Sequence, residues 1–112
     1  MPLVLRERTV GPITLLELGD RLTIENVPEL RDKIQSLVER RRLSVLVECN
    51  QITTVDSQGL GGLVRNWLSL RSHDGHLKLL SPSRRLLEVL KMTRLNDVIE
   101  SFDDIQPALR GF

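Results

Sequence analysis

The feature that most limits how this chain can fold is an alternation of short apolar runs with longer segments of helical period. Residues 3–10 and 13–18 read as two short strands, and Gly11-Pro12 between them is typical of a tight turn. We therefore predict a hairpin at the edge of a sheet, with charges on one side of its first strand.

Two amphipathic helices follow, with a buried strand between them. In residues 26–42, Asn26 can cap a helix whose first turn holds Pro28 and Glu29, and apolar residues recur at helical spacing. Residues 43–49 form a nearly continuous apolar run, which is typical of a central strand covered on both faces. The next helix has apolar residues on one face and ends at Asp74-Gly75; these are Leu60, Leu63, Val64, Trp67 and Leu68.

The C-terminal part continues the alternation. Residues 76–80 are short enough for a strand, and Ser81-Pro82 is expected to begin a third helix with Leu86, Leu87 and Leu90 inward. Residues 98–102 read as a last short strand, and residues 103–109 read as a terminal helix. The order β-β-α-β-α-β-α-β-α predicts an α/β fold, a single mixed β-sheet flanked by about four helices. Because we find no repeat or linker, we expect one domain over residues 1–112.

Size and charge exclude several classes of protein. A chain of 112 residues can bury a core without disulfides or a structural metal. Its 16 Lys and Arg and 15 Asp and Glu leave a formal charge of +1, so we expect no direct nucleic-acid partner. No apolar stretch approaches the roughly 20 residues needed to span a bilayer, and the N-terminus lacks a signal-peptide pattern. We therefore expect a cytoplasmic protein without membrane insertion.

Isolated reactive side chains do not form a convincing site. Cys49 lies in an apolar run and is expected to be a buried thiol in a reducing compartment. His73 and His76 flank a turn without a third ligand of matching spacing, so we predict neither a metal site nor a cofactor. Trp67 is expected to lie in the core or in an interface.

The stretch TVDSQGLGGL, residues 54–63, combines an acid, a hydroxyl and three glycines where a strand is expected to turn into a helix. A serine hydrolase is disfavoured because a long helix separates Ser57 from His73 and the G-x-S-x-G elbow is absent. A nucleotide loop is disfavoured because the Lys-Ser/Thr ending of a P-loop is missing and G-x-G-x-x-G is not matched. Glycines in a helix cost about 1 kcal/mol each relative to alanine, so Gly59, Gly61 and Gly62 indicate close approach to the sheet or to a partner.

Three stretches carry a resemblance to the STAS domain of bacterial anti-sigma factor antagonists, and the resemblance runs over nearly the whole chain. They are LLELGDRLTIENVPELRDKI, the motif Thr54-Val55-Asp56-Ser57-Gln58-Gly59-Leu60-Gly61, and SPSRRLLEVLKMTRLNDVIESFDDIQPAL. The order of elements resembles that family as well, and D-S-x-G-L-G at a helix start is the most specific part of the likeness.

The resemblance implies a small binding protein that is not an enzyme. Its partner would be an anti-sigma factor with serine kinase activity, and phosphorylation would switch binding off until a serine phosphatase reverses it. The phosphoacceptor falls on Ser57, and Gln58 stands where the family often has serine or alanine. The implied docking residues are Asp56, Ser57, Gln58, Gly59, Leu60 and Gly61. An alternative is a non-phosphorylated subunit of a stressosome-like or phospholipid ABC-transport assembly, and self-association as a homodimer is left open.

Physical chemistry makes a switch at this position reasonable. A phosphate adds a charge of about −1.5 to −2, and at a helix start we expect free backbone N–H groups and the helix dipole to stabilise it. The fold should then tolerate the phosphate, and the cost of burying the new charge would fall on the interface with a partner. In the non-switching alternative, Ser57 would serve only as a helix cap.

Overall fold

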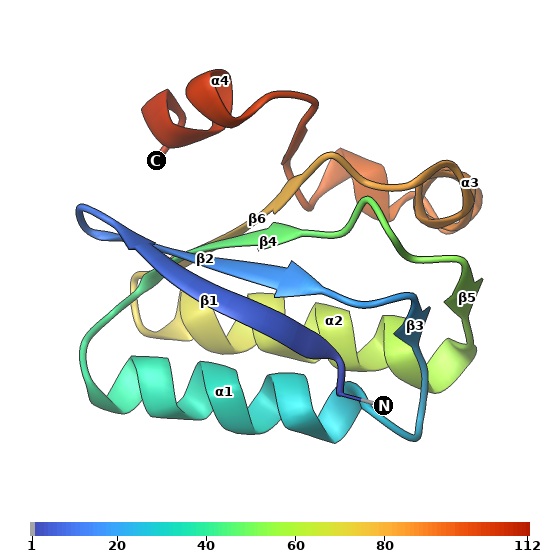
Figure 1. Cartoon of the computed structure of the whole chain (residues 1–112), viewed down its shortest axis with the longest axis horizontal. Helices are drawn as coiled ribbons and strands as arrows, with labels where there is room; N and C mark the ends of the chain where they lie inside the picture. Colours follow the sequence, from blue (N-terminus) through green and yellow to red (C-terminus); the bar gives the residue numbers. More distant parts are fainter. Residues whose placement is uncertain (1) are drawn as a thin grey trace.

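The computed structural model describes residues 2–112 and contains a five-stranded mixed sheet in the order β1-β2-β4-β6-β7 (Figure 1). The hairpin of β1 and β2 is antiparallel, and all other pairs in this sheet are parallel. The predicted edge hairpin and central strand are confirmed, with β4 in the middle. The strands are β1 (Val4–Val10), β2 (Ile13–Leu18), β4 (Ser44–Glu48), β6 (His76–Leu80) and β7 (Ser101–Phe102).

Helices cover both faces of this sheet. Figure 1 shows α1 and α2 side by side along one face and α4 over the opposite face. The predicted α/β fold with about four helices is confirmed. The helices are α1 (Val27–Glu39), α2 (Ser57–Ser72), α3 (Arg84–Met92) and α4 (Ile105–Arg110), with a short 3-10 helix η1 (Leu95–Asp97) after α3.

The central strand β4 shows why the sequence needs a continuous apolar run at this point. Val45 and Val47 lie in the larger core cluster with buried residues of α1, α2 and α3. Leu46 points to the other face, where it packs with Ala108 of α4 in a smaller cluster. Since successive side chains of a strand alternate between faces, a strand covered on both sides must be apolar throughout.

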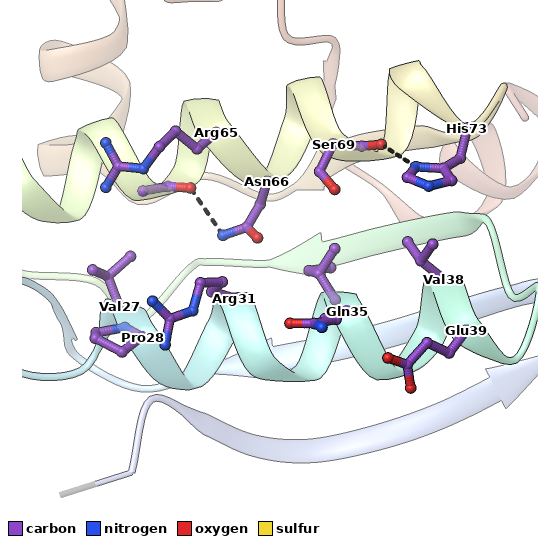
Figure 2. A pocket seen from close by; sticks show the side chains of 12 residues that line it. Val27, Pro28, Arg31, Gln35, Val38, Glu39, Arg65, Asn66, Ser69 and His73 are labelled. Carbon is purple, nitrogen blue, oxygen red and sulfur yellow. Dashed lines mark hydrogen bonds between the residues drawn. The ribbon is translucent and has the colours of Figure 1, made fainter.

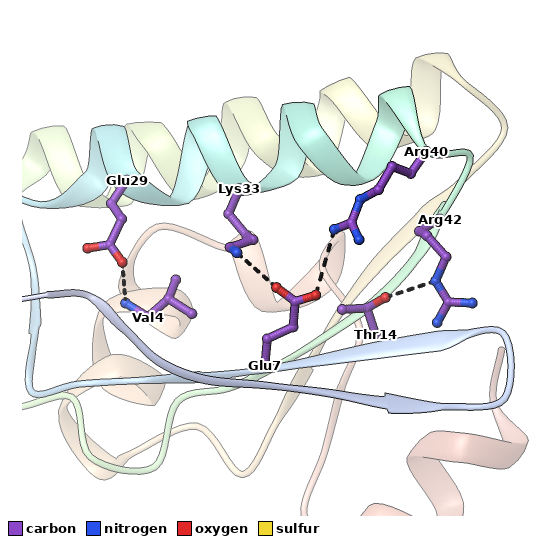
Figure 3. Close-up of polar contacts among 7 residues, drawn as sticks. All are labelled: Val4, Glu7, Thr14, Glu29, Lys33, Arg40 and Arg42. Atoms are coloured by element: carbon purple, nitrogen blue, oxygen red, sulfur yellow. Dashed lines mark hydrogen bonds and ion pairs between the residues drawn. The ribbon is translucent and has the colours of Figure 1, made fainter.

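Polar contacts fasten the edge strand β1 to α1 (Figure 3). The Glu29 carboxylate accepts a hydrogen bond from the backbone N–H of Val4 at 3.0 Å. The carboxylate of Glu7 lies 2.8 Å from Lys33 Nζ and 3.7 Å from the guanidinium of Arg40. The hydrogen bond from Lys33 is the main reason that the pKa of Glu7 lies below its usual value.

The charges of β1 occupy both faces of the strand, so the expectation of a single charged side is wrong. Glu7 faces the helix layer, where Lys33 lies. Its neighbour Arg6 points the opposite way because side chains alternate along a strand, and it pairs with Glu17 of β2 at 3.8 Å. An edge strand can place charges on both faces because little of its surface is covered, and all of β1 after Val4 is exposed.

A second, two-stranded parallel sheet was not predicted, so the sheet is not single. It joins β3 (Arg21–Leu22) to β5 (Thr54–Val55) directly before α2. Asn26 occupies the N-cap position of α1 but forms no capping hydrogen bond. Its side chain instead accepts from the N–H of Thr23 at 2.9 Å and donates to the carbonyl of Arg21 at 2.8 Å. The predicted capping residue therefore braces the loop that follows β3.

Two boundaries in the C-terminal part differ from the prediction. Helix α3 begins at Arg84 rather than at Ser81-Pro82, because the Ser83 hydroxyl accepts the N–H of Leu86 at 3.1 Å and caps it there. The last strand covers only residues 101–102, since η1 and its C-cap occupy the segment before it. Apolar side chains in that segment pack without strand pairing, and Leu95 of η1 lies against the main core.

Candidate functional site

Asp56, and not Ser57, caps the N-terminus of α2. Its carboxylate accepts the backbone N–H of Gly59 at 2.7 Å and the N–H of Ile24 at 3.1 Å. These hydrogen bonds, that from Gly59 first, hold the pKa of Asp56 below its ordinary value, so the side chain is ionised at neutral pH. The acid of the motif thus joins the start of α2 to the loop before α1, and the interpretation of Ser57 as a helix cap is wrong.

Ser57 is the first residue of α2, and both Ser57 and Gln58 are exposed. Among residues 2–112, no side-chain hydrogen bond involves the Ser57 hydroxyl, because the capping bond belongs to Asp56. Leu60 is half-buried and packs against the edge of the main core. The fold therefore leaves the hydroxyl of Ser57 accessible to an enzyme or a partner.

The three glycines of the motif have different surroundings. A Cβ at Gly59 would lie 1.9 Å from the carbonyl oxygen of Leu22, so this glycine allows α2 to touch the backbone of β3. A Cβ at Gly62 would lie 2.2 Å from a methyl group of Val27, so Gly62 allows α2 to approach α1. Gly61 is different, because its Cβ would meet only the guanidinium of Arg65, at 3.3 Å. Gly59 and Gly62 serve packing, and only Gly61 opens outward.

Two exposed apolar side chains extend the surface around Ser57, and sequence analysis missed both. Ile24 is 59% exposed and lies beside the start of α2, because its N–H is bonded to Asp56. Leu68 is 50% exposed, whereas its helical spacing had predicted a place on the inner face. Leu68 follows Val64 by one turn at the margin of the apolar face, and no local sequence signal distinguishes a margin from a buried position.

A groove of about 470 Å³ separates α1 from α2 (Figure 2). Arg65 and Asn66 line it from α2, and Arg31 and Gln35 line it from α1. Asn66 is only 4% exposed, and its side-chain amide donates to the carbonyl of Gly62 at 2.8 Å. The groove was not predicted from the sequence. The signal that could have indicated it is Asn66, a polar residue on the inner side of an amphipathic helix. None of the six predicted docking residues lines it.

The other reactive side chains, Cys49 and His73, lie away from the start of α2. Burial raises the pKa of the Cys49 thiol to about 12, and its Sγ lies 3.7 Å from the carbonyl oxygen of Leu80. His73 bonds through Nδ1 to the carbonyl of Ser69 at 2.8 Å. Over residues 2–112, no cluster of three or more His, Cys, Asp or Glu could hold a metal ion. None of the helices in that same range is both long and apolar enough to cross a bilayer.

Comparison with known proteins identifies the family. The model of the STAS domain matches residues 5–108. The chain belongs to the STAS domain family. This confirms the predicted resemblance, and the Asp56–Gly61 segment is then the start of α2 in a STAS fold. An anti-sigma-B factor antagonist of Listeria monocytogenes is 25% identical over 96 residues, which are 86% of this chain and 83% of the relative.

Solved structures of anti-sigma factor antagonists have the same fold. A candidate anti-sigma factor antagonist from Thermotoga maritima superposes with a TM-score of 0.87 at 22% identity, covering 95% of this chain and 92% of that one. The anti-sigma factor antagonist SpoIIAA of Bacillus superposes with TM-scores of 0.73 and 0.74 in its unphosphorylated and phosphorylated forms. Identity to SpoIIAA is 18%, over 96% of this chain and 98% of SpoIIAA.

Proposed function

We propose that this STAS protein, a single domain over residues 1–112, is an anti-sigma factor antagonist controlled by phosphorylation of Ser57. Its partner would be an anti-sigma factor with serine kinase activity. The observation that carries this proposal is that Asp56 and Ser57 have different roles at the start of α2. Asp56 caps the helix, which leaves the exposed hydroxyl of Ser57 without a structural task.

The docking surface would centre on Ser57, Gln58 and Gly61, with Leu60 and Asp56 at its edge. Gly59 would contribute indirectly, because it is buried and sets how closely α2 lies on β3. The small size of Ser57 and Gly61 would allow a partner's backbone to come close. Ile24 and Leu68 add apolar area on the same side of the motif.

Phosphorylation would act on the interface rather than on the fold. The kinase would transfer the γ-phosphoryl group of ATP to Ser57 Oγ, the hydroxyl proton would be lost, and ADP would leave. The new charge of about −1.5 to −2 would lie where the partner docks, and burying it there without a counter-charge is unfavourable. A serine phosphatase would restore binding by hydrolysis of the phosphate ester.

Two comparisons support this proposal. Sequence relatives include anti-sigma-B factor antagonists, and the fold is that of SpoIIAA, whose structure is known in a phosphorylated form. We further propose that the protein acts in the cytoplasm and has no enzymatic activity of its own, in keeping with partners that control transcription. The alternative is a subunit of a larger assembly that is not phosphorylated. In that alternative Ser57 was expected to cap α2, but Asp56 is the capping residue, so the alternative no longer explains the serine.

The test is to recover the partner from native lysate and to compare Ser57→Asp with Ser57→Ala. We expect the aspartate variant to bind the recovered partner at least tenfold more weakly, and the alanine variant to bind like the parent. Ser36→Asp, at an exposed serine of α1, controls for added charge alone. Intact mass after incubation with ATP and the partner should increase by one phosphate in the parent and not in Ser57→Ala. Unchanged mass and equal binding by all variants would refute the switch.

A further inference from the structure

A phosphate on Ser57 would compete with Asp56 for the backbone donors at the start of α2. The Asp56 carboxylate already takes the N–H of Gly59 and that of Ile24. The same carboxylate carries a negative charge directly beside Ser57, so it repels a second anion. A phosphate at Ser57 would therefore share the start of α2 with an existing anion, and a nearby cation would offset their repulsion.

Arg65 is the cation closest to this position along α2. One of its guanidinium nitrogens lies 3.3 Å from the point that a Cβ of Gly61 would occupy. Figure 2 shows its side chain running back toward the N-terminal end of the helix. In the described part of the chain, Arg65 forms neither an ion pair nor a hydrogen bond. The guanidinium charge of Arg65 is thus unpaired in the described residues and lies beside Gly61.

We infer that Arg65 is the intramolecular counter-ion of phosphorylated Ser57, reached across the open backbone of Gly61. This inference rests on the proposed function, because it assigns a partner to the phosphate that the switch requires. Arg65 is a positioning residue for the phosphate and takes no part in its transfer.

The spacing of α2 permits this pairing without rearrangement of the backbone. Residues 57, 61 and 65 follow one another at intervals of four and lie on one face, with Cβ positions of successive members about 5–6 Å apart. A guanidinium nitrogen already lies 3.3 Å from the Cβ position of the middle member, which is one turn from Ser57. A phosphate that turns away from Asp56 and toward Gly61 can accept two parallel N–H bonds from it.

Pairing would change the docking surface twice. The phosphate would bring a negative charge to its centre, and Arg65 would be withdrawn from contact with a partner. Gly61 would then serve regulation as well as docking, because a larger side chain at position 61 would displace the guanidinium. Among the described residues that line the groove, the second arginine is Arg31 of α1, which is already paired with Asp32 at 3.3 Å.

The experiment uses the full chain with phosphoserine encoded genetically at position 57, so that no kinase is needed. The second pKa of the phosphate is measured by ³¹P NMR titration at low ionic strength. We expect Arg65→Gln to raise that pKa by about half a pKa unit, since the charge-assisted pair favours the dianion. Arg65→Lys should restore part of the difference, and 1 M salt should remove most of it.

Arg71→Gln is the matched control, because it removes one positive charge from the same helix at the far end, where Arg71 lies over the ring of Trp67. Arg31→Gln tests the cation across the groove and should have the smaller effect of the two lining arginines. Gly61→Leu should raise the pKa as Arg65→Gln does, since it displaces the guanidinium.

Equal phosphate pKa values in Arg65→Gln and Arg71→Gln would overturn the inference. Failure of a kinase to modify Ser57 would refute the proposed function instead and leave this measurement unaffected.

Discussion

The two sides of α2 have opposite properties although they share one short sequence. The inner side packs on the sheet and on α1 through buried residues that include Gly59, Gly62 and Leu63. The outer side presents Ser57, Gln58 and Arg65, all exposed. A charge can therefore be added to the outer side while the packed side stays unchanged. The comparison shows how one helix can separate the stability of a domain from the regulation of its binding.

Gly59 and Gly61 are the closest pair in this comparison, only two residues apart. A methyl group at Gly59 would overlap the backbone of β3, and a methyl group at Gly61 would meet only a flexible arginine. Because consecutive helical residues are turned by about 100°, two positions are enough to move from the buried side to the open one. Substitutions along the first turn of α2 should therefore fall into two classes.

The largest effect is expected for Gly59→Ala. Its Cβ would lie 1.9 Å from the oxygen and 2.3 Å from the carbonyl carbon of Leu22, and backbone atoms cannot move aside as a side chain can. The free energy of unfolding should fall by about 3 kcal/mol or more. Urea unfolding followed by circular dichroism measures it. A melting temperature within two degrees of the parent's would show that α2 does not press on β3.

The second effect concerns the cap. Asp56→Ala removes both hydrogen bonds that join the start of α2 to the loop before α1, and the melting temperature should fall by roughly 4–8 °C. Partner binding should weaken in parallel, since the helix start would fray. Asp56→Asn is the control, because asparagine also caps helices well. Equal losses for alanine and asparagine would assign the effect to the charge alone.

Acid should remove the same contribution. The pKa of Asp56 is lowered in the folded state, so its stabilising effect is complete above the unfolded pKa of about 3.9 and is lost as pH falls through the lower folded value. The stability difference between the parent and Asp56→Ala should therefore be constant from pH 7 to about pH 5 and shrink below pH 4. Urea titrations at several pH values test this, and a difference that persists at pH 2 would contradict it.

The sequence predicts the order of the elements and the family, but not which residue caps the start of α2. The strand and helix order follows from apolar spacing, and the resemblance to the STAS domain follows from the D-S-x-G-L-G motif. The motif contains both Asp56 and Ser57 as capping residue types, and sequence alone did not decide between them. Asp56 caps through the N–H of Gly59, and it also accepts the N–H of Ile24, which comes from 32 residues earlier in the chain. Contacts at such separation are invisible to local patterns.

The remaining errors concern features that apolar spacing along the chain does not show. The small sheet of β3 and β5 has only two residues in each strand, which is too short for an apolar alternation to be recognised. The different tasks of Gly59, Gly61 and Gly62 depend on what lies opposite each one. The sequence indicated that something must approach these glycines closely, and the structure shows that β3 and α1 do so for two of them.

A smaller effect, of opposite sign, is expected for Gly61→Ala. Gly61 lies inside a helix where a Cβ would meet only the flexible end of Arg65, at 3.3 Å, and alanine is the better helix former by about 0.5–1 kcal/mol. The variant should therefore unfold at slightly higher urea concentration than the parent, whereas Gly59→Ala unfolds at much lower concentration. The two variants carry the same chemical change two residues apart. Destabilisation by both would mean that the outer side of α2 is covered.

The smallest change in stability is expected at Ser57, where the effect on binding should be greatest. Ser57 is the first helical residue and its hydroxyl does not cap α2, so Ser57→Ala should change the free energy of unfolding by less than about 0.5 kcal/mol. Ser57→Asp should be equally stable, because the favourable helix dipole and the repulsion from Asp56 oppose each other.

Affinity for the recovered partner, measured by calorimetry on the same samples, should separate the two Ser57 variants. Alanine adds no charge to the docking surface, so it should bind as the parent does, whereas aspartate places a carboxylate where the partner must lie. A loss smaller than that caused by true phosphoserine is expected, since a carboxylate carries less charge and fewer acceptor oxygens. If Ser57→Ala lost stability and affinity together while Ser57→Asp lost neither, the hydroxyl would have a structural task after all. The separation of the two sides of α2 would then fail at its first residue.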